Sequence, residues 1–135
     1  MNPEARQLRV QALGHVVLYV REIEASVHFY RDILGLKETG RGKNGRMAFF
    51  SAGAQHHDLA VQALGPDAPR PPKGSTGLYH VALKVGNSRE ELSAARAWIL
   101  EQGLTVFGET AQSFSVRDPD GHEVELYVDL IGEGG

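Results

Sequence analysis

Two histidines occupy matching places in a repeated sequence, and together with one glutamate of the second repeat they have the side-chain types of a metal centre. His15 stands in "GHVVLYV", and His80 stands sixty-five residues later in the similar segment "YHVALKV". A second pair of segments, "HHDLAVQ" and "GHEVELY", is related by the same offset, and its second member contains Glu125. Two imidazoles and one carboxylate bind a divalent metal and leave coordination positions open. A metal held in this way binds a substrate as a Lewis acid or, if it is iron, activates dioxygen.

The repeat divides the chain into two modules. Module one spans about residues 12–64 and module two about residues 77–130, and a Pro- and Gly-rich connector, 65–77, joins them. We expect each module to fold as β-α-β-β-β within one α+β domain that comprises residues 1–135. Placed side by side, the modules would form one curved mixed sheet around a central cleft, with the two equivalent histidines facing each other across it.

Hydrophobic spacing and turn signals predict the elements of each module. A helix is predicted from Ile23 to Leu34, with Gly35 as its C′ residue. A second helix begins after Ser88, because Ser88-x-x-Glu91 is a capping box. Runs of β-branched and aromatic residues between turn signals predict the strands. In chain order, the predicted strands are 15–20, 36–40, 46–51, 57–63, 80–85, 104–109, 113–117 and 123–129.

Strand alternation predicts that Glu125 points into the cleft. In "HEVELYV", Glu123, Glu125 and Tyr127 share one strand face, and apolar residues share the other. If the apolar face packs on the helices, Glu125 faces the cleft. Tyr127, two residues further on, is then a candidate to line the cleft, and a place in the core or in a subunit contact stays open as an alternative. Module one has Ala60 at the position equivalent to Glu125. The repeat therefore supplies three candidate protein ligands rather than four.

These segments also carry a family resemblance. "GHVVLYV", "FYRDILGL", "YHVALKV" and "DPDGHEVELY" resemble the vicinal-oxygen-chelate superfamily, which includes glyoxalase I, fosfomycin-resistance proteins, bleomycin-resistance proteins and type I extradiol dioxygenases. The resemblance covers nearly the whole chain, and it implies paired βαβββ modules with a divalent metal bound by His15, His80 and Glu125. Ala60 stands where glyoxalase I has a fourth, carboxylate ligand. This difference argues against a glyoxalase and for a three-ligand site, as in the dioxygenases and the fosfomycin-modifying enzymes.

Within the superfamily, "HHDLAV" resembles a segment of extradiol dioxygenases in which a histidine is the acid–base residue. His57 matches that histidine, and an imidazole suits proton transfer because its pKa lies close to neutrality. Strict alternation would turn His57 away from the cleft, so an irregular strand start or a bulge is needed to bring it inward. Ser115 occupies the place where those dioxygenases have a tyrosine. The cation-coordinating loop and the lysine of fosfomycin transferases are not evident.

The favoured hypothesis from the resemblance is an extradiol-dioxygenase-like enzyme. Iron(II) would be its metal, and a catecholic small molecule would bind through two vicinal oxygens. The first alternative is a non-redox isomerase, epimerase or transferase that uses Mn²⁺, Zn²⁺ or Ni²⁺ at the same residues. The second alternative is a bleomycin-resistance-like protein that sequesters a small molecule in a metal-free cleft.

Composition narrows the classes of function further. Fourteen basic and seventeen acidic residues give a formal net charge of −3 without a basic run, so nucleic-acid and anionic-membrane binding lack their positive patch. The absence of cysteine excludes disulfides, thiolate zinc sites and a cysteine nucleophile. The chain has no apolar run of a membrane span and no secretory signal at its start. We therefore expect a cytoplasmic protein. The resemblance adds a homodimer, whose modules pair either within one chain or between two chains.

Overall fold

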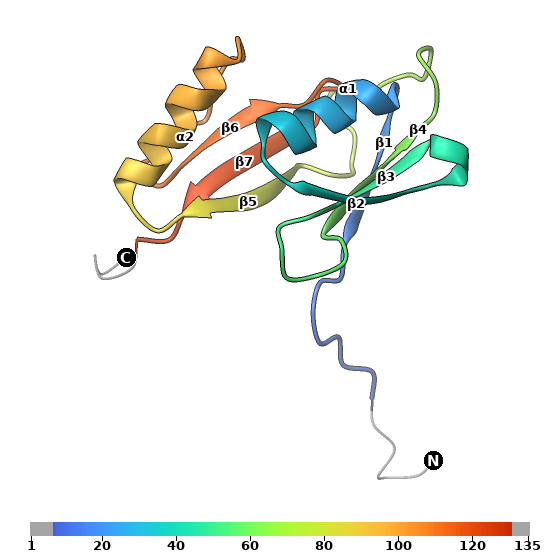
Figure 1. Cartoon of the computed structure of the whole chain (residues 1–135), viewed down its shortest axis with the longest axis horizontal. Helices are drawn as coiled ribbons and strands as arrows, with labels where there is room; N and C mark the ends of the chain where they lie inside the picture. The colour runs from blue at the N-terminus through green and yellow to red at the C-terminus, as the bar shows by residue number, and fades with distance from the viewer. Residues whose placement is uncertain (1–6, 131–135) are drawn as a thin grey trace.

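The computed structural model describes residues 7–130, and it confirms the α+β fold class (Figure 1). The ends of the expected domain, 1–6 and 131–135, lie outside the described residues. Within the described part, no helix is both long and apolar enough to cross a membrane. Module one contains β1 (Val16–Val20), α1 (Ile23–Val27), η1 (His28–Ile33), β2 (Lys37–Gly42), η2 (Lys43–Gly45), β3 (Met47–Ser51) and β4 (Leu59–Ala63). Module two contains β5 (His80–Gly86), α2 (Arg89–Glu101), β6 (Ser113–Arg117) and β7 (Glu123–Val128).

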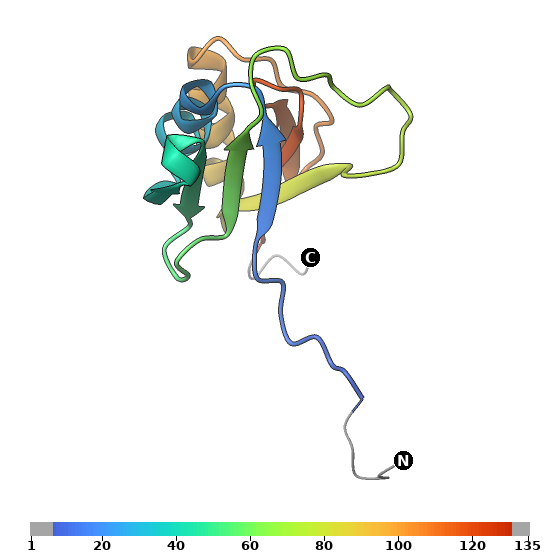
Figure 2. The same cartoon turned by 90° about the vertical axis from the view of Figure 1, so that its right-hand side faces the viewer.

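The strands form two mixed sheets with corresponding strand orders. Sheet one has the order β1-β4-β3-β2, and sheet two has the order β5-β7-β6. In both sheets the first strand of the module pairs in parallel with the last, and the last pairs antiparallel with the strand before it. Within residues 7–130 the expected curved surface is thus divided between two sheets that share no strand pairing. In Figure 2, β1 and β4 lie side by side, and the connector loops away from both sheets.

The strand predicted at 104–109 is wrong. In its place Phe107 forms an isolated bridge with Ser115, through two backbone hydrogen bonds of 3.0 and 2.8 Å. Gly103 and Gly108 flank this bridge with φ of +80° and +60°, and the left-handed conformation interrupts an extended strand. The other predicted strands are present within a few residues of their expected bounds. β4 begins two residues later than predicted, at Leu59.

Both helices are present with the expected end signals. The first is α-helical over α1 and π-helical over η1, and Gly35 follows it with φ of +79°. Ser88 caps α2 by accepting a hydrogen bond of 3.2 Å from the backbone N–H of Glu91. The Glu91 carboxylate accepts in return from the backbone N–H of Asn87, at 3.0 Å. The capping box is therefore confirmed.

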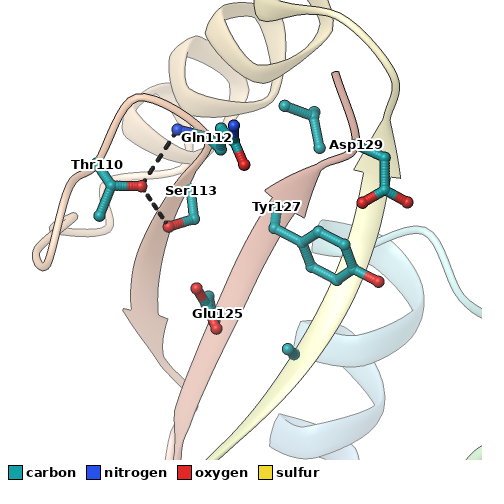
Figure 3. Close-up of a pocket in the computed structure, with 8 residues that line it drawn as sticks. Thr110, Gln112, Ser113, Glu125, Tyr127 and Asp129 are labelled. Carbon is teal, nitrogen blue, oxygen red and sulfur yellow. Dashed lines mark hydrogen bonds between the residues drawn. The ribbon is translucent and has the colours of Figure 1, made fainter. Parts of the chain in front are cut away.

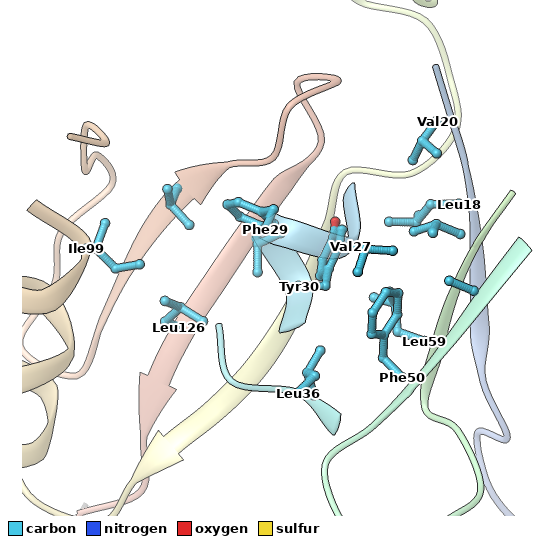
Figure 4. Close-up of a cluster of buried hydrophobic side chains, with 14 of the residues drawn as sticks. Leu18, Val20, Val27, Phe29, Tyr30, Leu36, Phe50, Leu59, Ile99 and Leu126 are labelled. Atoms are coloured by element: carbon cyan, nitrogen blue, oxygen red, sulfur yellow. The ribbon is translucent and has the colours of Figure 1, made fainter. Parts of the chain in front are cut away.

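One apolar core joins the modules, and α1 and η1 lie between the two sheets (Figure 4). Val27 and Tyr30 lie toward Phe50 of sheet one, whereas Phe29 lies on the side of β6 and β7. All four of these side chains are buried. From the α2 side of the same core, Ile99 packs toward sheet two. Because the same helix packs on both sheets, the modules hold each other in place.

A buried hydrogen bond connects this helix to the turn before β7. The Tyr30 hydroxyl donates to Asp118 Oδ2 at 2.7 Å. Asp118 Oδ1 also accepts from the backbone N–H groups of Asp120 and His122, both at 2.9 Å. His122 Nδ1 lies 2.8 Å from Asp118 Oδ2. Burial, reinforced by the Asp118 charge, raises the pKa of Tyr30 well above its ordinary value, so the phenol stays a donor.

The Tyr30 hydroxyl should contribute measurably to the stability of the fold. We expect Tyr30→Phe to lower the free energy of unfolding by about 1–3 kcal/mol, because a hydrogen bond to a buried carboxylate is lost. Urea denaturation measures this change. Glu101→Ala is the control, since its side chain is exposed at the end of α2. Equal stability of the Tyr30→Phe protein and the wild type would contradict the assignment.

The Asp118–His122 pair should make stability depend on pH. The hydrogen bond with Asp118 raises the pKa of His122, although desolvation opposes it. Burial alone would raise the pKa of Asp118, but the hydrogen bonds from His122 and Tyr30 outweigh it and lower that pKa.

A group whose pKa is higher in the folded state than in the unfolded state stabilises the fold. Its full contribution is present at pH values below the unfolded-state pKa, which is about 6.5 for histidine. The contribution is lost as the pH rises through the folded-state pKa. Wild-type stability should therefore decline as the pH rises above about 6.5. His122→Gln should remove most of this decline. Urea unfolding at several pH values between about 6 and 9, a range that includes the ordinary histidine pKa, measures the difference. An unchanged slope in the variant would count against the pair.

Candidate metal centre

The candidate ligands lie on the sheet faces that the helices leave uncovered. On β1, Leu18 and Val20 are buried in the core, whereas Val17 and Tyr19 on the other face are 42% and 63% exposed. His15 lies just before this strand and is exposed. On β7 the apolar residues are buried and the polar ones are half-buried, which confirms the predicted alternation. The half-buried side chains of β7 are Glu123, Glu125 and Tyr127.

His80 and Glu125 lie as close together as two ligands of one ion. His80 is the first residue of β5, Glu125 is in the middle of the neighbouring β7, and His80 Nε2 is 3.3 Å from Glu125 Oε2. Two donor atoms at about 2.1 Å from one metal, with tetrahedral or octahedral angles, are about 3.0–3.4 Å apart. The small side chain of Ala82 stands in register with Glu125. The pair therefore fits a divalent metal in both donor chemistry and spacing.

The other nitrogen of His80 faces a second carboxylate. His80 Nδ1 is buried and has no hydrogen-bond partner among the described residues. Glu123 Oε2 is 3.8 Å away, and it accepts a hydrogen bond of 3.1 Å from Ser115 Oγ. The alternation of β7 predicts the face on which Glu123 lies. Its proximity to the imidazole depends on strand register, which the sequence pattern does not reveal.

His15 is not part of this arrangement within one chain. Its ring lies 4.6 Å from the ring of His57, measured between centroids, on the uncovered face of sheet one. Across residues 7–130, no group of three His, Cys, Asp or Glu side chains is close enough to hold a metal ion. A single chain thus brings His80 and Glu125 together without His15.

His57 does lie on the same side as His15. The segment before Leu59 is irregular, and it turns the His57 ring against both His15 and Phe49, at centroid distances of 4.6 and 5.0 Å. His57 Nδ1 is also 2.8 Å from His56 Nδ1. Lost hydration lowers the pKa of His57, and the charges of His15 and His56 lower it further. The ring is therefore neutral near pH 7 and can accept a proton.

Ala60 occupies in module one the place that Glu125 occupies in module two. It is fully buried, and it stands in register with Val17 on β1 and with Phe49 on β3. The nearby carboxylate of Asp58 accepts hydrogen bonds from the Ala52 N–H and the Gln55 amide, at 2.7 and 2.5 Å. Sheet one therefore provides histidines at this face and no free carboxylate at the ligand position.

A pocket of about 550 Å³ opens beside Glu125 (Figure 3). Glu125 and Tyr127 point toward it from β7. The hydroxyls of Thr110, before β6, and of Ser113, the first residue of β6, are 2.8 Å apart and border it from the other side. Lys84 Nζ lies 3.2 Å from Asp129 at its end. The lining residues are Ala82, Thr110, Gln112, Ser113, Glu125, Tyr127, Val128 and Asp129. Because Glu125 lines it, the pocket lies beside the His80–Glu125 pair.

Comparison with known proteins identifies the family. The model of the glyoxalase/bleomycin resistance protein/dioxygenase superfamily matches residues 12–126. The chain belongs to this superfamily. A glyoxalase/dioxygenase from Nostoc punctiforme has the same fold, with a TM-score of 0.76 and 21% identity over 93% of this chain and 99% of that one. The resemblance on which the expected fold rests is therefore confirmed.

Two curated relatives of this superfamily member carry the names of enzymes with different reactions. An iron-dependent extradiol dioxygenase of Rhodococcus jostii is 31% identical, and the match covers 86% of this chain and 42% of that protein. The glutathione transferase FosA of Serratia marcescens is 35% identical, over 88% of this chain and 82% of that protein. The chain thus spans less than half the length of the dioxygenase and most of the length of the transferase. Membership of the superfamily does not by itself select one reaction.

Proposed function

We propose that this chain is a metal-dependent enzyme of the vicinal-oxygen-chelate type, with extradiol-dioxygenase-like ring cleavage as its reaction. The observation that carries the proposal is the 3.3 Å separation between His80 Nε2 and Glu125 Oε2 beside a pocket. His15 is the third ligand and iron(II) the favoured metal. When bound, iron(II) would supply chelation of two vicinal substrate oxygens and activation of dioxygen.

His15 reaches the site from a second copy of the chain. The described part of one chain does not assemble the three ligands, and large apolar side chains beside them are uncovered. Val17 and Tyr19 follow His15 on β1, and Tyr79, which precedes His80, is 76% exposed. Uncovered apolar patches mark interaction surfaces. A two-fold symmetric homodimer would cover these faces and form two equal sites, each with ligands from both chains.

The remaining side chains bind the substrate and move its proton. We assign the proton of the Nδ1···Nδ1 contact to His57, so that His57 Nδ1 donates to His56 and His57 Nε2 keeps the lone pair that accepts a proton from a substrate hydroxyl. The Phe49 ring, 5.0 Å from the His57 ring, excludes water on one side. Tyr127 and the Thr110 and Ser113 hydroxyls contact the part of the substrate that lies away from the ligands.

A metal-dependent transferase is the second candidate. Its support is the relative FosA, 82% of whose length is matched, against 42% for the dioxygenase. It would use the same three ligands with Mn²⁺, Zn²⁺ or Ni²⁺. It would consume no dioxygen.

The shared site makes a prediction about mixed dimers. His15→Ala and Glu125→Gln should each abolish stoichiometric metal binding by the purified protein. When the two variants are refolded together, half of the dimers are mixed, and each mixed dimer regains one intact site. About a quarter of the wild-type metal content should therefore return, as measured by elemental analysis. Recovery of no metal would place all three ligands in one chain, and a wild-type protein without metal would favour a metal-free binding protein.

Oxygen uptake separates the two enzyme candidates. The protein is loaded with iron(II) under anaerobic conditions and then exposed to air in the presence of each of a panel of catechols. We expect it to consume dioxygen. His57→Asn should retain iron and lower kcat by about 10²–10⁴-fold, because proton transfer is lost. Iron retention without uptake by the wild type would favour the transferase over the dioxygenase.

A further inference from the structure

We propose that Glu123 is a positioning residue that accepts a hydrogen bond from His80 Nδ1 and thereby directs the His80 Nε2 lone pair toward the site of the ion. This inference rests on the proposed function for its effect on metal binding. The proposed hydrogen bond concerns the metal-free chain. It can therefore be tested separately.

The first observation is the buried Nδ1 atom of His80. This nitrogen has no hydrogen-bond partner among residues 7–130, although a buried polar atom without a partner is unfavourable. The Glu123 carboxylate faces it, with Oε2 at 3.8 Å. A charge-assisted N–H···O bond needs about 2.8 Å, so a shift of the Glu123 carboxylate by about 1 Å would complete the bond.

The second observation is that the fold holds Glu123 in place. Parallel pairing of β5 with β7 puts His80 in register with Glu123, so the backbone brings the two side chains to one face. Ser115 Oγ donates to Glu123 Oε2 at 3.1 Å, and Arg117 lies 4.0 Å from the other carboxylate oxygen. The Glu123 side chain is only 12% exposed. It is thus a restrained acceptor rather than a solvated surface group.

The consequence follows from the two nitrogens of imidazole. A neutral ring has one donor and one acceptor nitrogen, so an N–H at Nδ1 leaves Nε2 with a lone pair. If the proton were on Nε2 instead, it would point at Glu125 Oε2, 3.3 Å away, and compete with a metal for both ligands. Glu123 thus prepares His80 before a metal arrives.

The tautomer of His80 in the metal-free protein tests the inference directly. We expect ¹⁵N-edited NMR of the wild type at neutral pH to show the Nδ1–H form. Glu123→Gln keeps an acceptor oxygen and should preserve this form. Glu123→Met has a similar size without an acceptor, and it should shift the population toward Nε2–H. Glu101→Ala, an exposed change at the end of α2, is the control and should behave as the wild type.

Zn²⁺ titration of the same proteins measures the effect on the ligand set. Glu123→Met should weaken Zn²⁺ binding about 10–100-fold, as expected for loss of a carboxylate behind a metal-bound histidine. Glu123→Gln should weaken it less, whereas equal loss in both variants would make Glu123 a direct ligand and overturn the inference. An Nε2–H tautomer in the wild type would also overturn it, even if the Met variant failed to fold. A wild type with the Nδ1–H form and no Zn²⁺ binding would support the contact and refute the proposed function.

Discussion

The burial of the Asp118 carboxylate is the constraint on which the arrangement of the two modules depends. A buried carboxylate is stable only when donors surround it, and here they come from three sources. The turn itself supplies backbone N–H groups, His122 supplies an imidazole, and Tyr30 supplies a hydroxyl from the other module. The neighbouring Asp120 also accepts from the backbone N–H of Arg21 at 3.1 Å. The turn is therefore anchored both to Arg21, just before α1, and to Tyr30, within η1, and β7 begins from a fixed point.

That fixed starting point determines which side chains meet on sheet two. β7 leaves the turn with His80 beside Glu123 and with Ala82 beside Glu125. The equivalent pairing of β1 with β4 places Val17 beside Ala60. One duplicated strand register thus has two outcomes, because the residue types at matching positions differ. Module two has two carboxylates around one imidazole, whereas module one has a cluster of imidazoles next to Phe49.

Local patterns were sufficient to predict most elements and the orientation of β7. Alternation in "HEVELYV" is a property of neighbouring residues, so it predicted the face of Glu125 without knowledge of the rest of the fold. The capping box at Ser88 is local in the same sense. The failure at 104–109 also has a local cause, because Gly103 and Gly108 permit a conformation that a strand pattern does not reveal.

Features that join distant segments could not be derived in this way. Strict alternation predicted that His57 faces away, yet the irregular segment before β4 turns its ring toward His15. The Tyr30–Asp118 hydrogen bond connects residues eighty-eight positions apart, and no sequence pattern specifies such a pair. The separation of the surface into two sheets is a tertiary property for the same reason. The family resemblance supplied candidate ligands, but only geometry shows that His80 and Glu125 meet without His15.

The proposed homodimer explains why the candidate ligands lie on two different uncovered sheet faces of one chain. A single chain satisfies its core with one helix between two sheets, so each sheet keeps its outer face free for another surface. The exposed aromatic and aliphatic side chains next to His15 and His80 supply apolar area for association. Association and ligand assembly would then be one event. A separated chain would retain only the His80–Glu125 pair, and two ligands hold a divalent ion less firmly than three.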